Sequence, residues 1–93
     1  MKTASDPRHL KRIKLMQQLF AANFRDKPEP AVKNIWDNLK IIDPLISQAA
    51  PEWPLERINP TDLAILRLAV WELVIDKTTP IRVIIDESIE LAK

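Results

Sequence analysis

The 93-residue sequence contains no glycine, no cysteine and a single histidine. Without glycine the chain cannot form the Gly-rich loops that let a backbone approach a phosphate group, and hairpin turns with positive φ are disfavoured. Without cysteine it has no disulfide framework, no thiolate nucleophile and no cysteine-based zinc cluster. The sequence assembles no general base, nucleophile or metal cluster, so we expect no catalytic residue, metal ion, cofactor or enzymatic activity.

Long apolar runs are also missing. No stretch approaches the ~18 apolar residues of a membrane span, and the charged residues 1–14 lack the apolar core of a signal peptide. We therefore expect a cytoplasmic protein with no membrane segment. Hydrophobic residues make up 46% and charged residues 29%, a composition typical of a folded chain. At this length we expect one domain over residues 1–93.

The net charge of +1 conceals an asymmetry between the two halves of the chain. Residues 1–40 hold nine basic against four acidic residues, whereas residues 41–93 hold five basic against nine acidic ones. Most of the positive excess precedes Leu15. Such polarity suits a polyanion at one end of the molecule and a different partner at the other. A solvated helix end is the alternative interpretation of the basic run.

Five of the eight prolines stand where a helix can begin, since the first helical position needs no backbone N–H. A good capping residue precedes four of them, namely Asp6, Asp43, Asn59 and Thr79. The fifth follows Glu29, a weaker cap. The sequence therefore predicts an all-α bundle of about five helices, over residues 7–24, 30–42, 44–49, 60–77 and 80–93.

The first predicted helix has two faces. Its apolar stripe has the three- and four-residue spacing of a helix and consists of Leu10, Ile13, Met16, Phe20 and Phe24. Arg8, Lys11 and Arg12 are expected on the opposite side, with Lys14 on a flank. The first half of this helix is therefore expected to be solvated and positively charged.

The helix over 60–77 is expected to be the central one. Between Leu63 and Ile75 only Arg67 and Glu72 interrupt an apolar run, and a helix that is apolar on all sides is wrapped by others. These two residues are about 140° apart around the helix, so each should find a partner on another element and hold the fold together.

The last helix is predicted to turn an apolar face inward. That face consists of Ile81, Ile84, Ile85, Ser88, Leu91 and Ala92. Asp86, Glu87, Glu90 and Lys93 are expected on the polar face, and Glu87 is assigned a structural polar role beside Arg67 and Glu72.

Two long motifs resemble those of the NusB family. The first is Trp53-Pro-Leu-Glu-Arg57-Ile58, followed by the helix Asp62-Leu-Ala-Ile65-Leu66-Arg67-Leu-Ala-Val-Trp71-Glu72-Leu73. The second is Pro80-Ile-Arg-Val83-Ile-Ile85-Asp86-Glu87-Ser88-Ile89-Glu90-Leu91-Ala92-Lys93. Arg8, Arg12 and the run Gln17-Gln-Leu-Phe20 are similar to the arginine-rich first helix of that family. Residues 25–51 match only by helix pattern.

The resemblance implies a compact, NusB-like, non-enzymatic transcription antitermination factor. Members of the family bind the boxA element of nascent ribosomal RNA transcripts as a heterodimer with the ribosomal protein NusE, within the transcription elongation complex. The arginine-rich helix contributes to the RNA surface, which by resemblance would consist here of Arg8, His9, Lys11, Arg12 and Lys14. The more C-terminal helices face the protein partner.

The sequence departs from the family after Leu91-Ala-Lys, where members normally continue with a further helix. We therefore expect an exposed apolar groove along the helices over 60–77 and 80–93, which another chain could fill. Two alternatives to an RNA-binding factor remain open at this stage. One is a protein-interaction module, including a homodimer, with weakened RNA binding; the other is a NusB-like domain of an RNA methyltransferase.

Overall fold

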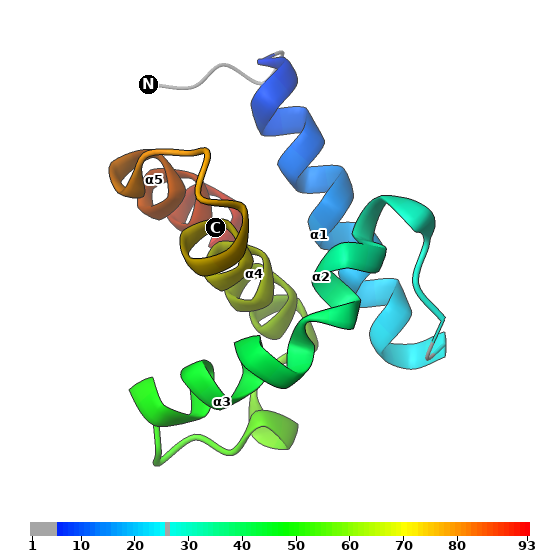
Figure 1. Cartoon of the computed structure of the whole chain (residues 1–93), viewed down its shortest axis with the longest axis vertical. Helices are drawn as coiled ribbons and strands as arrows, with labels where there is room; N and C mark the ends of the chain where they lie inside the picture. Colours follow the sequence, from blue (N-terminus) through cyan, green and yellow to red (C-terminus); the bar gives the residue numbers. More distant parts are fainter. Residues whose placement is uncertain (1–5, 26) are drawn as a thin grey trace.

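The computed structural model of the chain describes residues 6–25 and 27–93. All regular structure within these residues is helical, and Figure 1 shows the helices arranged as a bundle. The α-helices are α1 (Pro7–Arg25), α2 (Lys33–Asp37), α3 (Leu39–Ala49), α4 (Pro60–Trp71) and α5 (Ile81–Ala92). The shorter segments are the 3-10 turns η1 (Pro30–Val32) and η2 (Leu55–Arg57) and the π-helical η3 (Glu72–Asp76). The predicted all-α fold class is confirmed.

Two of the predicted helix starts are formed by the expected caps. The backbone N–H of Arg8 donates to Oδ1 of Asp6 at 2.9 Å, and that of Thr61 donates to Oδ1 of Asn59 at 2.9 Å. Each cap satisfies one of the amide groups that lack a partner in the first helical turn. The proline after each cap occupies the first helical position, so α1 and α4 begin where the sequence places them.

The chain between α1 and α4 is divided differently from the prediction. Instead of helices over 30–42 and 44–49, the break between α2 and α3 lies at Asn38, and Pro44 lies inside α3. Nδ2 of Asn38 donates to the backbone carbonyl of Asn34 at 2.7 Å. This side-chain hydrogen bond takes the place of the one that a backbone N–H would donate to the same carbonyl in a continuous helix. The predicted helix start at Pro44 is therefore wrong.

The predicted cap at Thr79 is also wrong. Pro80, which was expected to open the last helix, is extended at φ −59° and ψ 143° and stands before its first residue, Ile81. No side chain caps this helix. α5 therefore begins one residue later than predicted.

The second half of the central helix is not regular. After α4 the helix continues as the wider π-helical segment η3. This helical segment ends at Lys77, which adopts the left-handed conformation at φ 57° and ψ 19°. The N–H of Lys77 donates to the carbonyl of Glu72 at 3.0 Å. Glycine normally occupies such a position because it has no Cβ, and in a chain without glycine a lysine takes it.

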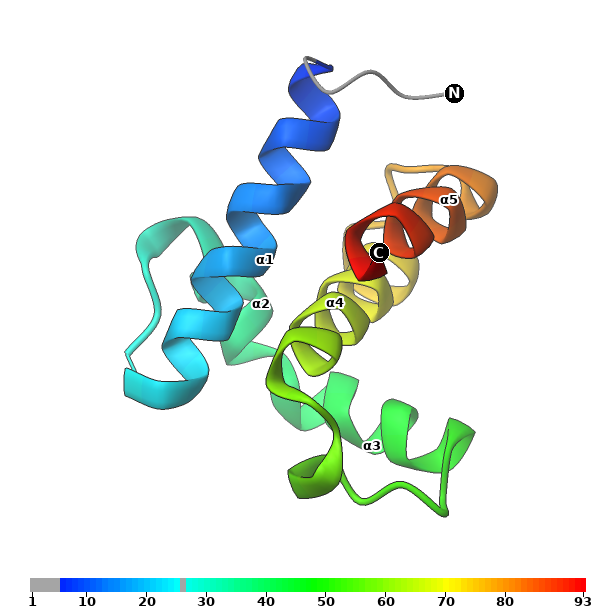
Figure 2. The same cartoon turned by 180° about the vertical axis from the view of Figure 1, so that it is seen from behind.

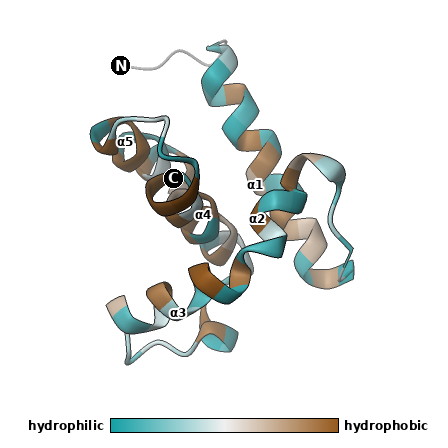
Figure 3. Ribbon diagram, viewed as in Figure 1, coloured by the Kyte–Doolittle hydropathy of each residue, from teal (hydrophilic) through white to brown (hydrophobic). Residues whose placement is uncertain are grey.

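The core forms around α4, which packs against α1, α3 and α5. Figures 1 and 2 show α1 and α5 on either side of α4 and α3 crossing near its beginning. The main cluster of buried side chains joins α1, η1, α2, α3 and α4, and consists of Leu19, Val32, Ile35, Ile42, Ile46, Leu63, Ala64 and Leu68. In Figure 3 hydrophobic colouring follows α4 and α5.

The expectation that the central helix is covered on all sides is wrong. Leu66 of α4 and Leu73 and Val74 of η3 are exposed, because the packed helices leave one side of this segment open. On α5 the inward face is centred on Ile84 and Glu87, whereas Ile85 is 51% exposed. The large apolar side chains expected along a groove on these two helices are therefore exposed.

The first helix is also rotated relative to the predicted stripe. Leu10 and Phe24, both assigned to the apolar face, are exposed, the latter by 65%. The buried face is instead the one that carries Arg12, Leu19 and Ala22. The outer end of the predicted stripe is stabilised locally, since the ring of Phe24 packs edge-on against the ring of Phe20 at 5.0 Å between centroids.

Candidate nucleic-acid interface

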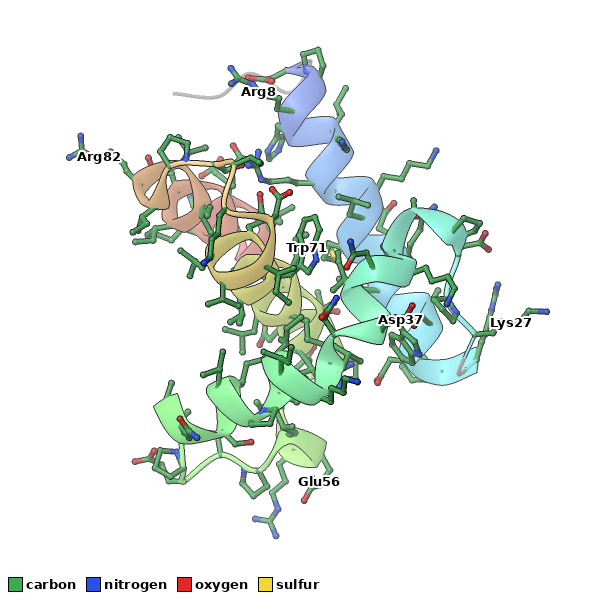
Figure 4. All side chains as sticks on the ribbon, viewed as in Figure 1. Arg8, Lys27, Asp37, Glu56, Trp71 and Arg82 are labelled. Atoms are coloured by element: carbon green, nitrogen blue, oxygen red, sulfur yellow. The ribbon has the colours of Figure 1, made fainter. Side chains whose placement is uncertain are left out.

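The first turns of α1 project beyond the other helices (Figures 1 and 2) and carry the basic residues that the sequence singled out. Arg8, Lys11 and Lys14 are exposed, and none of them forms an ion pair with another residue in the described part of the chain. Figure 4 shows Arg8 at the free end of the helix. These three side chains therefore present an unneutralised positive surface to solvent.

Arg12 does not share this surface, and its predicted place on the solvated face is wrong. Its side chain is buried and donates to the carboxylate of Glu72 in η3, with Nη2 at 2.9 Å and Nε at 3.2 Å from Oε2. Leu19 and Ala22 share its side of the helix and pack inward, which draws the guanidinium toward η3. The pair joins the first half of α1 to η3, directly after α4.

His9 is likewise turned toward the bundle. Its Nδ1 lies 2.8 Å from Oε1 of Glu87 on α5, and the exposed fractions of the two side chains are 15% and 1%. The placement of Glu87 on the polar face of the last helix is wrong, because this carboxylate reaches across to α1. His9 and Arg12 thus tie the basic helix to two different elements.

Arg67 forms a further polar contact within the bundle. It donates from Nε and Nη2 to the two carboxylate oxygens of Asp43 at 3.0 and 2.9 Å, and from Nη1 to Oδ1 of Asn23 at 3.4 Å. Its guanidinium carbon also lies 5.9 Å from the centroid of the Trp36 ring. Asp43 was predicted to cap a helix, but its carboxylate instead accepts two parallel hydrogen bonds from Arg67. Through Arg67 the helices α1, α3 and α4 are joined.

A cavity of about 480 Å³ lies beside the exposed cations. It is formed by α1, η1, α2, α4, η3 and the turn after η3, and its lining includes Arg8, Lys11, Leu15, Ile35 and Trp71. Figure 4 shows the Trp71 ring in the space between α4 and α1. The lining also includes Arg12 with its partner Glu72, and Asp76. The cavity therefore combines apolar walls, which suit a flat apolar group, with charged residues of both signs.

Sequence reasoning did not find this cavity, because its lining comes from segments whose relative placement periodicity does not give. One signal for the rotation of α1 was present. Leu15, Leu19 and Ala22 lie at helical spacing on the side of Arg12 and form a second apolar stripe. Ranking that stripe above the outer one would have placed Arg12 inside.

The remaining electrostatic features are local. At the end of α5 a hydrogen bond from Lys93 to Glu90 lowers the pKa of the exposed Glu90 carboxyl below its ordinary value. Within residues 6–25 and 27–93 no group of three or more histidine, aspartate or glutamate side chains is placed to hold a metal ion. None of the helices in these ranges is both long and apolar enough to cross a membrane.

Comparison with known proteins places this helical bundle in a family. Residues 9–93 match the NusB family. The transcription antitermination protein NusB of Herpetosiphon aurantiacus is 37% identical over 79 residues, which are 82% of this chain and 54% of that protein. Its counterpart in Thermotoga maritima is 47% identical over 62 residues, 67% of this chain and 44% of that protein. The NusB of Syntrophotalea carbinolica is 41% identical over 76 residues, 82% of this chain and 49% of that protein.

The all-helical fold, with a basic first helix packed on an apolar central one, is that of a helical-bundle protein. Within this broad class of protein, the family match covers almost the whole chain, and the chain therefore belongs to the NusB family. It spans about half the length of the curated relatives it matches. No solved structure matches it.

Proposed function

We propose that the chain acts in transcription antitermination as a NusB-type factor, binding boxA-like single-stranded RNA together with the ribosomal protein NusE in the transcription elongation complex. The single observation that carries the RNA part is the exposed cationic surface of Arg8, Lys11 and Lys14 on α1. The antitermination part is supported by the relatives, which are named transcription antitermination proteins. The activity is one of binding and not of catalysis.

The two buried pairs of α1 give this surface its orientation. Arg12 and His9, both predicted to touch RNA, are held by Glu72 and Glu87 and serve to fix the rotation of the helix. The cations at positions 8, 11 and 14 then lie on the solvent-exposed side of the helix. Single-stranded RNA is commonly bound through its phosphates and through unstacked bases, and the neighbouring 480 Å³ cavity has the apolar walls that suit a base.

Salt dependence tests the RNA surface. Three phosphate contacts at ~0.7 each predict a log–log slope of affinity against salt of about −2 for a boxA-like single-stranded RNA. The double variant Arg8→Gln/Lys11→Gln should reduce the magnitude of that slope by about 1.4. The control is Lys40→Gln/Arg57→Gln, which removes the same charge from exposed positions on α3 and η2. Equal slopes for the two double variants, with or without NusE, would contradict the proposal.

A protein-interaction module is the second candidate, and one observation favours it. Ile81, Ile85 and Ile89 recur every four residues along α5 and are all exposed. Such a row is the pattern of a helix that packs against another chain. The row supports a contact with NusE on the side of the molecule formed by α5, or with a second copy of this chain.

Light scattering coupled to size-exclusion chromatography separates the two candidates. A monomer that gains mass only when RNA is added supports the RNA-binding factor. A dimer that ignores RNA and dissociates in the variant Ile85→Glu supports the interaction module. A mass that is monomeric at every concentration, with and without NusE, would contradict the interaction module.

A further inference from the structure

A second group of cations begins at Lys14, in the middle of α1, and continues to the opposite end of the helix. Lys14, Arg25 and Lys27 are exposed, and none of them is paired with a carboxylate among the described residues. Figure 4 shows Lys27 extending away from the helices. Together with two glutamines, two alanines and Glu29, the three cations line a cavity of about 250 Å³. Among the described residues of that lining, Glu29 is the single acidic one.

This group continues the basic face of the helix. Lys11, Lys14, Gln18 and Arg25 are separated by three, four and seven residues, which places them on one side of an α-helix. At 1.5 Å per residue, the 19 residues of α1 span about 28 Å. The exposed cations Arg8, Lys11, Lys14 and Arg25 are therefore distributed along α1, with Gln18 between Lys14 and Arg25 and with Lys27 just beyond the end of the helix.

Gln18 lies on this face between Lys14 and Arg25. Its Oε1 is buried without a hydrogen-bond partner, although Gln18 lines the second cavity. Buried amide oxygens in proteins are nearly always hydrogen-bonded. A carboxamide has two donors as well as an acceptor, so rotation of its last bond would present an N–H to a phosphate oxygen or to the edge of a base.

We propose that Lys14, Arg25 and Lys27 form a second phosphate-binding subsite, which receives the backbone of the same single-stranded RNA after it leaves Arg8 and Lys11. The inference rests on the proposed RNA-binding function and extends it. A flexible strand can follow a cationic helix face for its whole length, and each phosphate neutralised along the way adds to affinity and to its salt dependence. Five contacts in place of three change the expected salt slope from about −2 to about −3.5.

RNA length distinguishes one subsite from two. Affinity and salt slope are measured for single-stranded RNA probes of about 3 and about 20 nucleotides, since the shorter probe is too short to reach both ends of the helix. The variants are Arg25→Gln/Lys27→Gln, Arg8→Gln/Lys11→Gln and the control Lys40→Gln/Arg57→Gln. All six positions are exposed, so the folded state should be retained, as circular dichroism would verify.

The first variant is expected to weaken binding of the long probe roughly tenfold at low salt and to reduce the magnitude of its slope by about 1.4. The wild type should prefer the long probe more strongly than this variant does. If Arg25→Gln/Lys27→Gln binds the long probe like the control while Arg8→Gln/Lys11→Gln does not, the second subsite is overturned and the proposed function stands. If the wild type binds neither probe, the proposed function fails. If Arg25→Gln/Lys27→Gln weakens the binding of polyglutamate as much as it weakens the binding of the long RNA probe, the assignment of this subsite to RNA is overturned.

Discussion

Arg12 in α1 and Glu72 in η3 form a buried ion pair between residues that are 60 positions apart in the sequence. The pair fixes how α1 is rotated about its own axis. With Arg12 directed inward, Leu19 and Ala22 face the core and Lys11 and Lys14 face solvent. Arg12, which the sequence predicted to contact RNA, thus determines which neighbouring cations face solvent.

Removing only one member of this pair should be strongly destabilising. Arg12→Met leaves the carboxylate of Glu72 buried without its guanidinium partner, and we expect a loss of about 3–5 kcal/mol in the free energy of unfolding. Urea denaturation followed by circular dichroism measures it. The double variant Arg12→Met/Glu72→Met removes both charges and should recover most of the loss. Equal stability of the single variant and the wild type would show that the pair does not hold α1 in place.

The fork between Arg67 and Asp43 predicts that lysine cannot replace this arginine. Arg67→Lys keeps the charge but loses the two parallel hydrogen bonds and the contact with the Trp36 ring. We expect a loss of about 1.5–3 kcal/mol in the same denaturation experiment. The exposed pair of Lys33 and Asp37 supplies the control, since Lys33→Gln should cost less than about 1 kcal/mol. Similar losses in the two variants would contradict the structural role of the fork.

Much of the fold could be predicted because its determinants are local. The caps at Asp6 and Asn59 mark the starts of α1 and α4, and the apolar run after Leu63 identifies the central helix. The break at Asn38 escaped prediction because it depends on a side chain bonding back to the carbonyl of Asn34, which competes with a proline signal six residues later.

The candidate site was predictable in composition but not in orientation. The basic residues of α1 are evident from the sequence, yet which of them face solvent depends on long-range pairing with Glu72 and Glu87. The angle of about 140° around the helix between Arg67 and Glu72 correctly predicted that each has its own partner on another element. In the structure Arg67 pairs with Asp43, and Glu72 pairs with Arg12. Angular spacing within one helix cannot identify those partners, because they lie on other elements.

Lys77 offers a prediction of increased stability. Its left-handed conformation costs a residue with a Cβ roughly 1–2 kcal/mol, and glycine avoids that cost at the price of a more flexible unfolded chain. We expect Lys77→Gly to raise the free energy of unfolding by about 0.5–1 kcal/mol. Lys14→Gly, the same change at an exposed position in the interior of α1, should lower it by about 1 kcal/mol. A decrease for both variants would show that Lys77 is not held in this conformation.

Two adjacent isoleucines of α5 test its orientation, which the sequence predicted correctly for Ile84 and incorrectly for Ile85. Ile84 is 1% exposed and Ile85 is 51% exposed, although both were placed on the inward face. Ile84→Ala should therefore leave a cavity and cost about 2–5 kcal/mol, whereas Ile85→Ala should change the free energy of unfolding of the monomer by no more than about 0.5 kcal/mol. The measurement is urea denaturation at two protein concentrations, because a contribution of Ile85 that grows with concentration would indicate that this side chain is buried against a second copy of the chain. Equal losses at low concentration would mean that α5 is rotated relative to the arrangement described above, and that the row of Ile81, Ile85 and Ile89 is not open to a partner.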